Sequence, residues 1–394
     1  MSDPRYTPLR ERHEALGASF TDFGGWQMPV RYTSDLAEHH AVRRAAGLFD
    51  ISHMAEFLIT GDYAAEFLDF ALAGRISSMP VGKAKYSLVL SDDGGIIDDV
   101  IAYRLAEDRY LVIANAGNRG AVDSAFASRV RAFPSRIERE LPERAEGEER
   151  SFAGFLGDRG VDVEDVSDTY ALLAVQGPAA EAIVAATQGI TELGTPWAEQ
   201  KYYAWAEAYF LGQPLLIART GYTGEDGFEL LVREGDAPAL WDALLSAGEP
   251  HGLVPAGLAA RDTLRLEAGM PLYGHELTRE TKPAQAGLGR VVAADKDDFV
   301  GKDALDAAPD APVLVGLTAE GKRAGRAGYA VVAASGETLG EITSGALSPT
   351  LGHPIAMAYV HPSSAEEGTE VFLDVRGTRI PATVTALPFY RRTK

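Results

Sequence analysis

Two consecutive aspartates, Asp98 and Asp99, interrupt the apolar run Ile96–Tyr103, which is otherwise typical of a β-strand. Side chains alternate between the two faces of a strand, so Asp99 shares its face with Ile101 and Tyr103, and Asp98 faces the other way. At least one carboxylate must therefore point into an apolar or ligand-lined region, where it needs a partner or is held protonated. Such a carboxylate can orient a nitrogen base or an amine. An aspartate that only caps nearby backbone is the alternative.

The same hairpin carries two more aspartates, Asp92 and Asp93, in the turn Ser91–Gly95. Turn chemistry explains both of them, because the glycines that follow can adopt positive φ. The spacing of the four aspartates is not that of an EF-hand loop, so we do not expect a calcium site here.

A glycine-rich loop, Gly221–Gly227, is the second candidate binding feature. Its glycines let the backbone approach a ligand closely, and Tyr222 within it could stack on a flat ring. Glu229 follows inside an apolar strand, much as Asp99 does. A carboxylate on a pocket wall can bind the amide–amidine edge of a pterin or guanine by accepting two parallel N–H bonds. An ordinary loop after a strand is the alternative.

Two arginines four residues apart, Arg261 and Arg265, form the third feature. They lie on one face of a helix predicted over 256–268, where like charges repel unless something anionic lies opposite. Asp262 and Glu267 could serve locally. An external carboxylate, which an arginine fork binds bidentately, is the functional alternative.

Composition and absent motifs exclude several classes of function. The chain of 394 residues has no cysteine, which excludes disulfides, Cys-ligated zinc, iron–sulfur clusters and a thiol nucleophile. Nucleotide-binding and zinc-hydrolase motifs are absent. A formal charge of −20 disfavours nucleic acid and anionic membranes as partners, and no apolar run is long enough to cross a bilayer. The start of the chain lacks the pattern of a targeting peptide, so we expect a cytoplasmic protein.

The elements that must position these residues alternate between helices and strands up to about residue 290. The patterns predict strands over 48–60, 86–90 and 96–103 and a helix over 118–130. Segment 134–166 is dominated by charge and is expected to be an insertion or linker. After residue 300, six short strands separated by turn residues suggest a small barrel or sandwich. We therefore expect one region over 1–290 and a second domain over 300–394.

Five segments, taken together, resemble the aminomethyltransferase family of the glycine cleavage system, the T-proteins. They occur in this order along one chain, and the resemblance runs from Thr7 nearly to its end: Gly47–Met54, Gly94–Asp99, Gly221–Gly227, Ala259–Gly269 and Ile342–Gly352. The resemblance implies an α+β fold with three lobes in a cloverleaf around a central folate channel. Two interleaved α+β lobes would share the first region, and the last lobe would be the β-barrel-like domain.

The resemblance also implies roles for single residues. Asp99, rather than its neighbour Asp98, would be the catalytic carboxylate beside the reactive folate nitrogens. Glu229 would bind the pterin edge, and the arginines would contact folate or its acidic tail. The implied folate-binding residues are Tyr86, Tyr103, Asn115, Tyr203, Tyr222, Glu229, Arg261 and Arg391. No metal is implied.

The implied reaction needs a second protein, the lipoylated H-protein, as carrier. Its S-aminomethyl group would pass its one-carbon unit to tetrahydrofolate, giving 5,10-methylenetetrahydrofolate, ammonia and the dihydrolipoyl carrier. A nearby carboxylate can move a proton and stabilise the cationic carbon that forms. Two alternatives stay open: a tetrahydrofolate-dependent demethylase of a small sulfonium or methylamine donor, and a folate-binding protein without enzyme activity.

Overall fold

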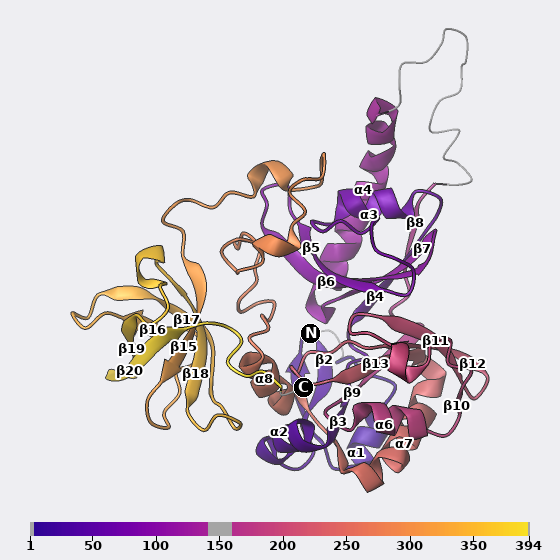
Figure 1. Cartoon of the computed structure of the whole chain (residues 1–394), viewed down its shortest axis with the longest axis horizontal. Coiled ribbons are helices and arrows are strands. Elements are labelled where there is room, and N and C mark those ends of the chain that lie inside the picture. Colours follow the sequence, from indigo (N-terminus) through magenta and orange to yellow (C-terminus); the bar gives the residue numbers. More distant parts are fainter. Residues whose placement is uncertain (1–3, 141–159, 393–394) are drawn as a thin grey trace.

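The computed structural model describes residues 4–140 and 160–392 and arranges them as three lobes (Figure 1). Two lobes are built on separate β-sheets and the third is a closed barrel. This confirms the three-lobed α+β fold expected from the family resemblance. Among the described residues, no helix has both the length and the apolar character needed to cross a membrane.

The first lobe is a five-stranded antiparallel sheet. Two helices, α3 (Ala64–Ala71) and α4 (Arg119–Glu140), pack on one face, where Phe57 of the sheet meets Phe67 and Phe126 of the helices. The strands, in spatial order, are β5 (Ala84–Leu90), β6 (Ile96–Ala106), β7 (Arg109–Ala114), β4 (Ala55–Thr60) and β8 (Asp162–Asp165).

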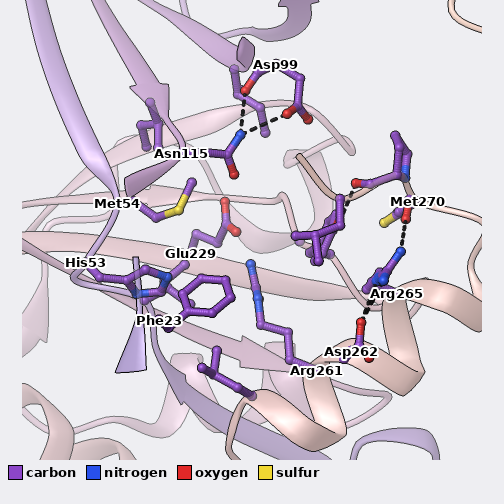
Figure 2. Close-up of a pocket in the computed structure, with 18 of the residues that line it drawn as sticks. Phe23, His53, Met54, Asp99, Asn115, Glu229, Arg261, Asp262, Arg265 and Met270 are labelled. Atoms are coloured by element: carbon purple, nitrogen blue, oxygen red, sulfur yellow. Dashed lines mark hydrogen bonds and ion pairs between the residues drawn. The ribbon is translucent and has the colours of Figure 1, made fainter. Parts of the chain in front are cut away.

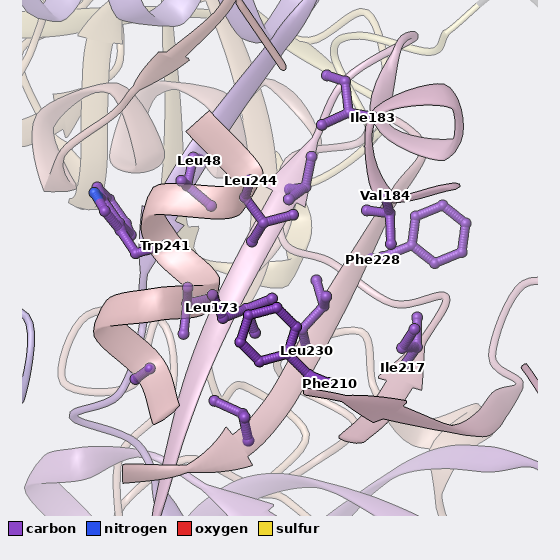
Figure 3. Packing of buried hydrophobic residues seen from close by; sticks show 14 of the residues in the cluster. Leu48, Leu173, Ile183, Val184, Phe210, Ile217, Phe228, Leu230, Trp241 and Leu244 are labelled. Atoms are coloured by element: carbon purple, nitrogen blue, oxygen red, sulfur yellow. The ribbon is translucent and has the colours of Figure 1, made fainter. Parts of the chain in front are cut away.

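The second lobe is a seven-stranded sheet whose apolar face is covered by α1 (Arg10–Ala15), α6 (Ala180–Ala186) and α7 (Ala237–Gly248). Trp241 and Leu244 of α7 belong to one buried cluster with Leu48 and Leu173 of the sheet, and Figure 3 shows Leu244 on the side of the helix that faces the strands. The strands, in spatial order, are β10 (Ile190–Thr191), β11 (Trp205–Phe210), β12 (Gln213–Ala218), β13 (Gly227–Arg233), β9 (Tyr170–Gln176), β3 (Ala46–Asp50) and β14 (Leu253–Pro255).

The third lobe, the C-terminal barrel, closes six strands on one another. Alternate side chains such as Leu317, Val331 and Leu373 fill its interior. The strands, in spatial order, are β15 (Val313–Ala319), β18 (Pro354–Val360), β17 (Thr338–Leu347), β16 (Ala330–Val332), β19 (Glu370–Val375) and β20 (Thr378–Thr385). The six strands predicted after residue 300 are thus present and form a barrel, not a sandwich.

Helix α8 (Leu258–Glu267) joins the lobes, together with α2 (Asp35–Arg44) and the hairpin of β1 (Ser19–Phe23) and β2 (Trp26–Arg31). The last residue of α8, Glu267, is fully buried. It accepts hydrogen bonds from Ser348 Oγ (2.5 Å) and Thr350 Oγ1 (2.8 Å) of the barrel and from Arg43 of α2 (2.7 Å). This cluster clamps the barrel to the rest of the chain.

Two predictions of local structure were wrong in their extent. The strand expected over 48–60 is two strands, β3 and β4, which belong to different sheets and are joined by a bend over 51–54. The helix expected over 118–130 continues to Glu140. Of the charged segment expected over 134–166, residues 141–159 lie outside the described residues. Strand β3 precedes the first sheet in the chain and pairs with β9, which follows that sheet.

Candidate active site

A cavity of about 630 Å³ lies between the two sheets, with α8 along one side. Asp99, Ile101 and Tyr103 of β6 line it together, which confirms the face predicted from strand alternation. Glu229 of β13 and Arg261 of α8 lie on the other walls (Figure 2). Residues from both lobes therefore meet in one space of a size typical of small-molecule sites.

Asp99 is held by hydrogen bonds to both of its carboxylate oxygens. The hydroxyl of Tyr86 on β5 donates to Oδ2 (3.0 Å), and the amide nitrogen of Asn115, just after β7, donates to Oδ1 (2.8 Å). Burial raises the pKa of Asp99, and these two hydrogen bonds partly oppose the rise. Asp99 is thus an oriented carboxyl group whose proton affinity exceeds that of an exposed aspartate, as a group that exchanges protons requires.

Asp98 is fully buried and does not line the cavity. Its oxygens accept hydrogen bonds from the backbone N–H of Asn115 (2.9 Å), the Asn115 side chain (2.8 Å) and the Asn118 side chain (2.6 Å). Burial and the adjacent charge of Asp99 raise the pKa of Asp98, against these three donors. Of the two aspartates, only Asp99 faces the cavity.

Glu229 lies on the opposite wall, and only one of its two carboxylate oxygens accepts hydrogen bonds from the residues that the structure describes. Its Oε2 accepts hydrogen bonds from Thr220 Oγ1 (2.5 Å) and Tyr103 OH (3.5 Å). Within the described part of the chain, no side chain donates to Oε1. The free oxygen leaves this carboxylate able to accept N–H bonds from a ligand.

Arg261 is a partly buried cation without an ion-pair partner among residues 4–140 and 160–392. Its guanidinium lies 4.9 Å from the ring centre of Tyr222 and 6.0 Å from that of Phe49, and its NH1 is buried without a hydrogen bond. Burial lowers the pKa of Arg261, although Glu229 and Tyr222 work against this. A buried guanidinium with an unsatisfied donor is suited to bind an acceptor on a ligand.

Arg265 differs from Arg261, although the sequence placed both on one helix face. Its guanidinium forms ion pairs with Asp262 (2.7 Å) and Glu276 (3.0 Å) and donates a hydrogen bond to Ser344 of the barrel (2.8 Å). The expectation of a local carboxylate partner therefore holds for Arg265 and not for Arg261. Arg265 also donates to the carbonyl of Met270, which fixes a loop on the cavity wall.

The remaining predicted tyrosines lie in the cavity wall. Tyr222 donates through its hydroxyl to the carbonyl of Pro271 (2.5 Å), so its ring is fixed across the space beside Arg261. Tyr203 lines the cavity with φ of +57°, a left-handed conformation that costs energy for a tyrosine and often marks a functional site. Arg391 is exposed and is not among the cavity-lining residues, so its contact with a ligand stays a prediction.

Several lining residues were missed by sequence reasoning, among them Phe23, His53, Met54 and Met270. His53 is buried, and its Nδ1 has no hydrogen-bond partner among the described residues. Burial lowers the pKa of His53 to about 4, so the ring is neutral at pH 7. His53 and Met54 lie in the bend between β3 and β4, and polar residues inside a supposed strand were the signal that could have revealed it.

Comparison with known proteins gives one consistent result. Residues 9–296 match the family model described as the GCVT N-terminal domain, and residues 313–391 match the glycine cleavage T-protein C-terminal barrel domain. The chain is 52% identical to the aminomethyltransferase of Saccharopolyspora erythraea over all of both chains. It is 51% identical to that of Streptomyces coelicolor, covering 99% of this chain and 98% of that one.

The crystal structure of glycine cleavage system aminomethyltransferase T from Bartonella henselae matches the whole fold. The two share 38% of their sequence and a TM-score of 0.81, and the match covers 99% of each chain. Identity at this level over full length, together with family models that span both the two-sheet region and the barrel, leaves one assignment: the chain belongs to the glycine cleavage T-protein family.

Proposed function

We propose that this protein is an aminomethyltransferase that transfers a one-carbon unit from the S-aminomethyl-dihydrolipoyl arm of the glycine cleavage H-protein to tetrahydrofolate. The family assignment and the aminomethyltransferase relatives support the reaction. The observation that carries it is Asp99, a partly buried carboxyl group oriented by Tyr86 and Asn115 in a cavity that also holds Glu229 and Arg261.

The cavity fits a reduced folate in its chemistry. Aromatic walls from Tyr86, Tyr203 and Tyr222 offer flat surfaces for a pterin and a benzoyl ring. The free Oε1 of Glu229 can accept N–H bonds from the aminopyrimidine edge. The unpartnered guanidinium of Arg261 can donate to a carbonyl or carboxylate of the same ligand. Residues 1–290 would form this folate-binding region, and residues 300–394 the barrel that closes it.

The reaction breaks the carbon–nitrogen and carbon–sulfur bonds of the aminomethyl group and forms two bonds from that carbon to folate nitrogens. The two folate N–H protons leave in exchange, one with the ammonia and one with the lipoyl thiol. Asp99 would accept a proton from the folate amine and stabilise the cationic carbon formed as ammonia departs. The apolar walls exclude water, which would otherwise hydrolyse that carbon.

The direct test measures ammonia released by the purified protein with tetrahydrofolate and an aminomethyl-loaded lipoyl carrier. Release that needs both the carrier and tetrahydrofolate would establish the proposed function. Controls omit one of them at a time. Tetrahydrofolate binding without ammonia release would contradict it and favour either a demethylase acting on a small methylated donor or a binding protein.

A further inference from the structure

The side-chain amide of Asn115 lies between two carboxylates. Its nitrogen donates to Asp98 Oδ1 (2.8 Å) and to Asp99 Oδ1 (2.8 Å), with the main-chain carbonyl of Asp99 as a longer acceptor (3.2 Å). The backbone N–H of the same residue donates to Asp98 Oδ2 (2.9 Å). Asn115 follows β7 and precedes the short 3-10 helix η1 (Ala116–Asn118), whose last residue, Asn118, also donates to Asp98.

These contacts fix which end of the amide faces the cavity. A carboxylate accepts and does not donate, so the NH₂ end must face Asp98 and Asp99, and the carbonyl oxygen must face away from them. Figure 2 shows the nitrogen of Asn115 turned toward Asp99 and its oxygen turned into the space between Asp99 and Glu229. No described residue donates a hydrogen bond to this oxygen.

Asp98 has the features of a fixed anchor for this arrangement. It is 0% exposed and is not part of the cavity wall, and both of its oxygens accept hydrogen bonds from Asn115 or Asn118. Asp99, by contrast, faces the cavity, and Asn115 holds only its Oδ1, while Tyr86 holds its Oδ2. The buried Asp98 therefore acts directly on Asn115, and on Asp99 only through Asn115.

We propose that Asp98 is a positioning residue that locks the polarity of Asn115, so that Asn115 Oδ1 and the Asp99 carboxylate together present only acceptors to the reacting part of the ligand. A paired acceptor surface favours a ligand with N–H groups, or a carbon that becomes positive, and disfavours a ligand that carries a carbonyl oxygen at the same place. This inference rests on the proposed function, because it assigns tetrahydrofolate to the cavity.

The test compares two ligands that differ at one nitrogen. In tetrahydrofolate N5 carries a hydrogen, which can be donated. In 5-formyltetrahydrofolate a formyl group replaces this hydrogen, and its carbonyl oxygen can only accept. Dissociation constants for both are measured by calorimetry on the full-length wild type and on Asp98→Asn. In this variant no amide orientation can accept from both the side-chain NH₂ and the backbone N–H of Asn115, so the hold on the Asn115 amide from this side is weakened. We expect the preference for tetrahydrofolate over the formyl compound to fall by about tenfold.

The matched control is Asn118→Ala, which removes a donor to Asp98 but leaves both contacts of Asp98 with Asn115. It should keep the wild-type preference. Asn115→Ala provides a second route if Asp98→Asn does not fold: it deletes the cavity-facing oxygen, and the preference should fall there too.

The proposal is overturned if Asp98→Asn weakens both ligands by the same factor, since that is the signature of a purely structural role. It is also overturned if Asn115→Ala keeps the preference. Failure of the proposed function would look different, because the wild type itself would then release no ammonia or bind no tetrahydrofolate.

Discussion

Asp99 enters the cavity with one oxygen bound by Tyr86 and the other by Asn115, so its direction is set before any ligand arrives. Pre-set groups of this kind act on the transition state without first having to be reorganised. Glu229 and Arg261, in contrast, each keep an unsatisfied polar atom. The residues thus divide into one carboxylate that is already fixed on both oxygens and two groups with a polar atom still free to bind a ligand.

Replacing Asp99 by asparagine should separate chemistry from binding. Asp99→Asn keeps the shape of the side chain but loses the ability to accept a proton, so we expect turnover to fall by ~10²–10⁴-fold while tetrahydrofolate affinity changes far less. Steady-state ammonia release and calorimetry would measure the two effects. Asp92→Asn, an exposed residue in the turn of the same hairpin, is the matched control and should behave as the wild type. Normal turnover by Asp99→Asn would remove Asp99 from the mechanism.

For single residues, the sequence was informative where a regular pattern decides the direction in which a side chain points. Period-two alternation correctly placed Asp99 and Tyr103 on one face, because β6 is regular there. The same reasoning could not distinguish Arg261 from Arg265, because two of the partners of Arg265 lie outside the helix: Glu276 in the loop that follows it and Ser344 in the barrel. Likewise, no local pattern reveals that the amide of Asn115 bridges Asp98 and Asp99.

The hairpin of β5 and β6 owes its position to the turn at its tip. Gly94 adopts φ of +77°, and the backbone at Gly95 lies against the loop 278–281, where Ile96 N donates to the carbonyls of Thr278 (3.3 Å) and Thr281 (3.2 Å). A Cβ at Gly95 would lie 1.7 Å from the carbonyl oxygen of Arg279. The glycine therefore allows the loop to pack onto the strand that carries Asp99.

Gly95→Ala should consequently destabilise the protein by ~1–3 kcal/mol, because backbone on one side must move to admit the methyl group. Denaturant unfolding followed by circular dichroism measures the change. Gly120→Ala, in α4, meets no atom within 4 Å and should instead raise the stability by ~0.5 kcal/mol. Equal stability of Gly95→Ala and the wild type would show that this loop is not held against the turn.

Element types were predicted well where turn residues or strong periodicity mark their ends, as in this hairpin and in the helix ending near Glu267. The prediction of one strand over 48–60 was wrong because two mostly apolar strands of different sheets follow one another closely in the sequence. Both β3 and β4 are apolar and buried, and only the bend at 51–54 separates them. Which sheet a strand joins depends on partners far away in sequence, such as Gln176 for Gly47.

The three lobes are held together by buried charge as well as apolar packing. Burial alone would raise the pKa of Glu267, but hydrogen bonds from His39 and Ser348 and the charge of Arg43 lower it to about 2. The ionised carboxylate is therefore favoured by the folded state, in which it joins α8, α2 and the barrel. The strand spacing after residue 300 predicted a small barrel or sandwich, whereas this clamp needed the structure.

The clamp makes a prediction about pH. Because the folded-state pKa of Glu267 lies below its usual 4.5, its contribution to stability is complete above about pH 4.5 and is lost as pH falls toward 2. Glu267→Gln should be less stable than the wild type by ~3 kcal/mol at pH 6, and the difference should shrink as the pH is lowered. Urea unfolding between pH 3 and 7 measures this. Glu337→Gln, at an exposed turn, serves as the control, and a difference independent of pH would contradict the assignment.

The placement of β3 also has a consequence for the order in which the chain can fold as it is synthesised. All five strands of the first sheet lie between Ala55 and Asp165, so that sheet can be completed early. Strand β3 leaves the ribosome before them, yet its partners β9 and β14 begin only at Tyr170 and Leu253. An entirely buried strand must therefore wait, with its backbone unpaired, while about 120 to 200 further residues emerge. The strand of the second lobe that is synthesised first can therefore pair only late. We expect chaperones to shield this apolar segment in the nascent protein until β9 and β14 have emerged.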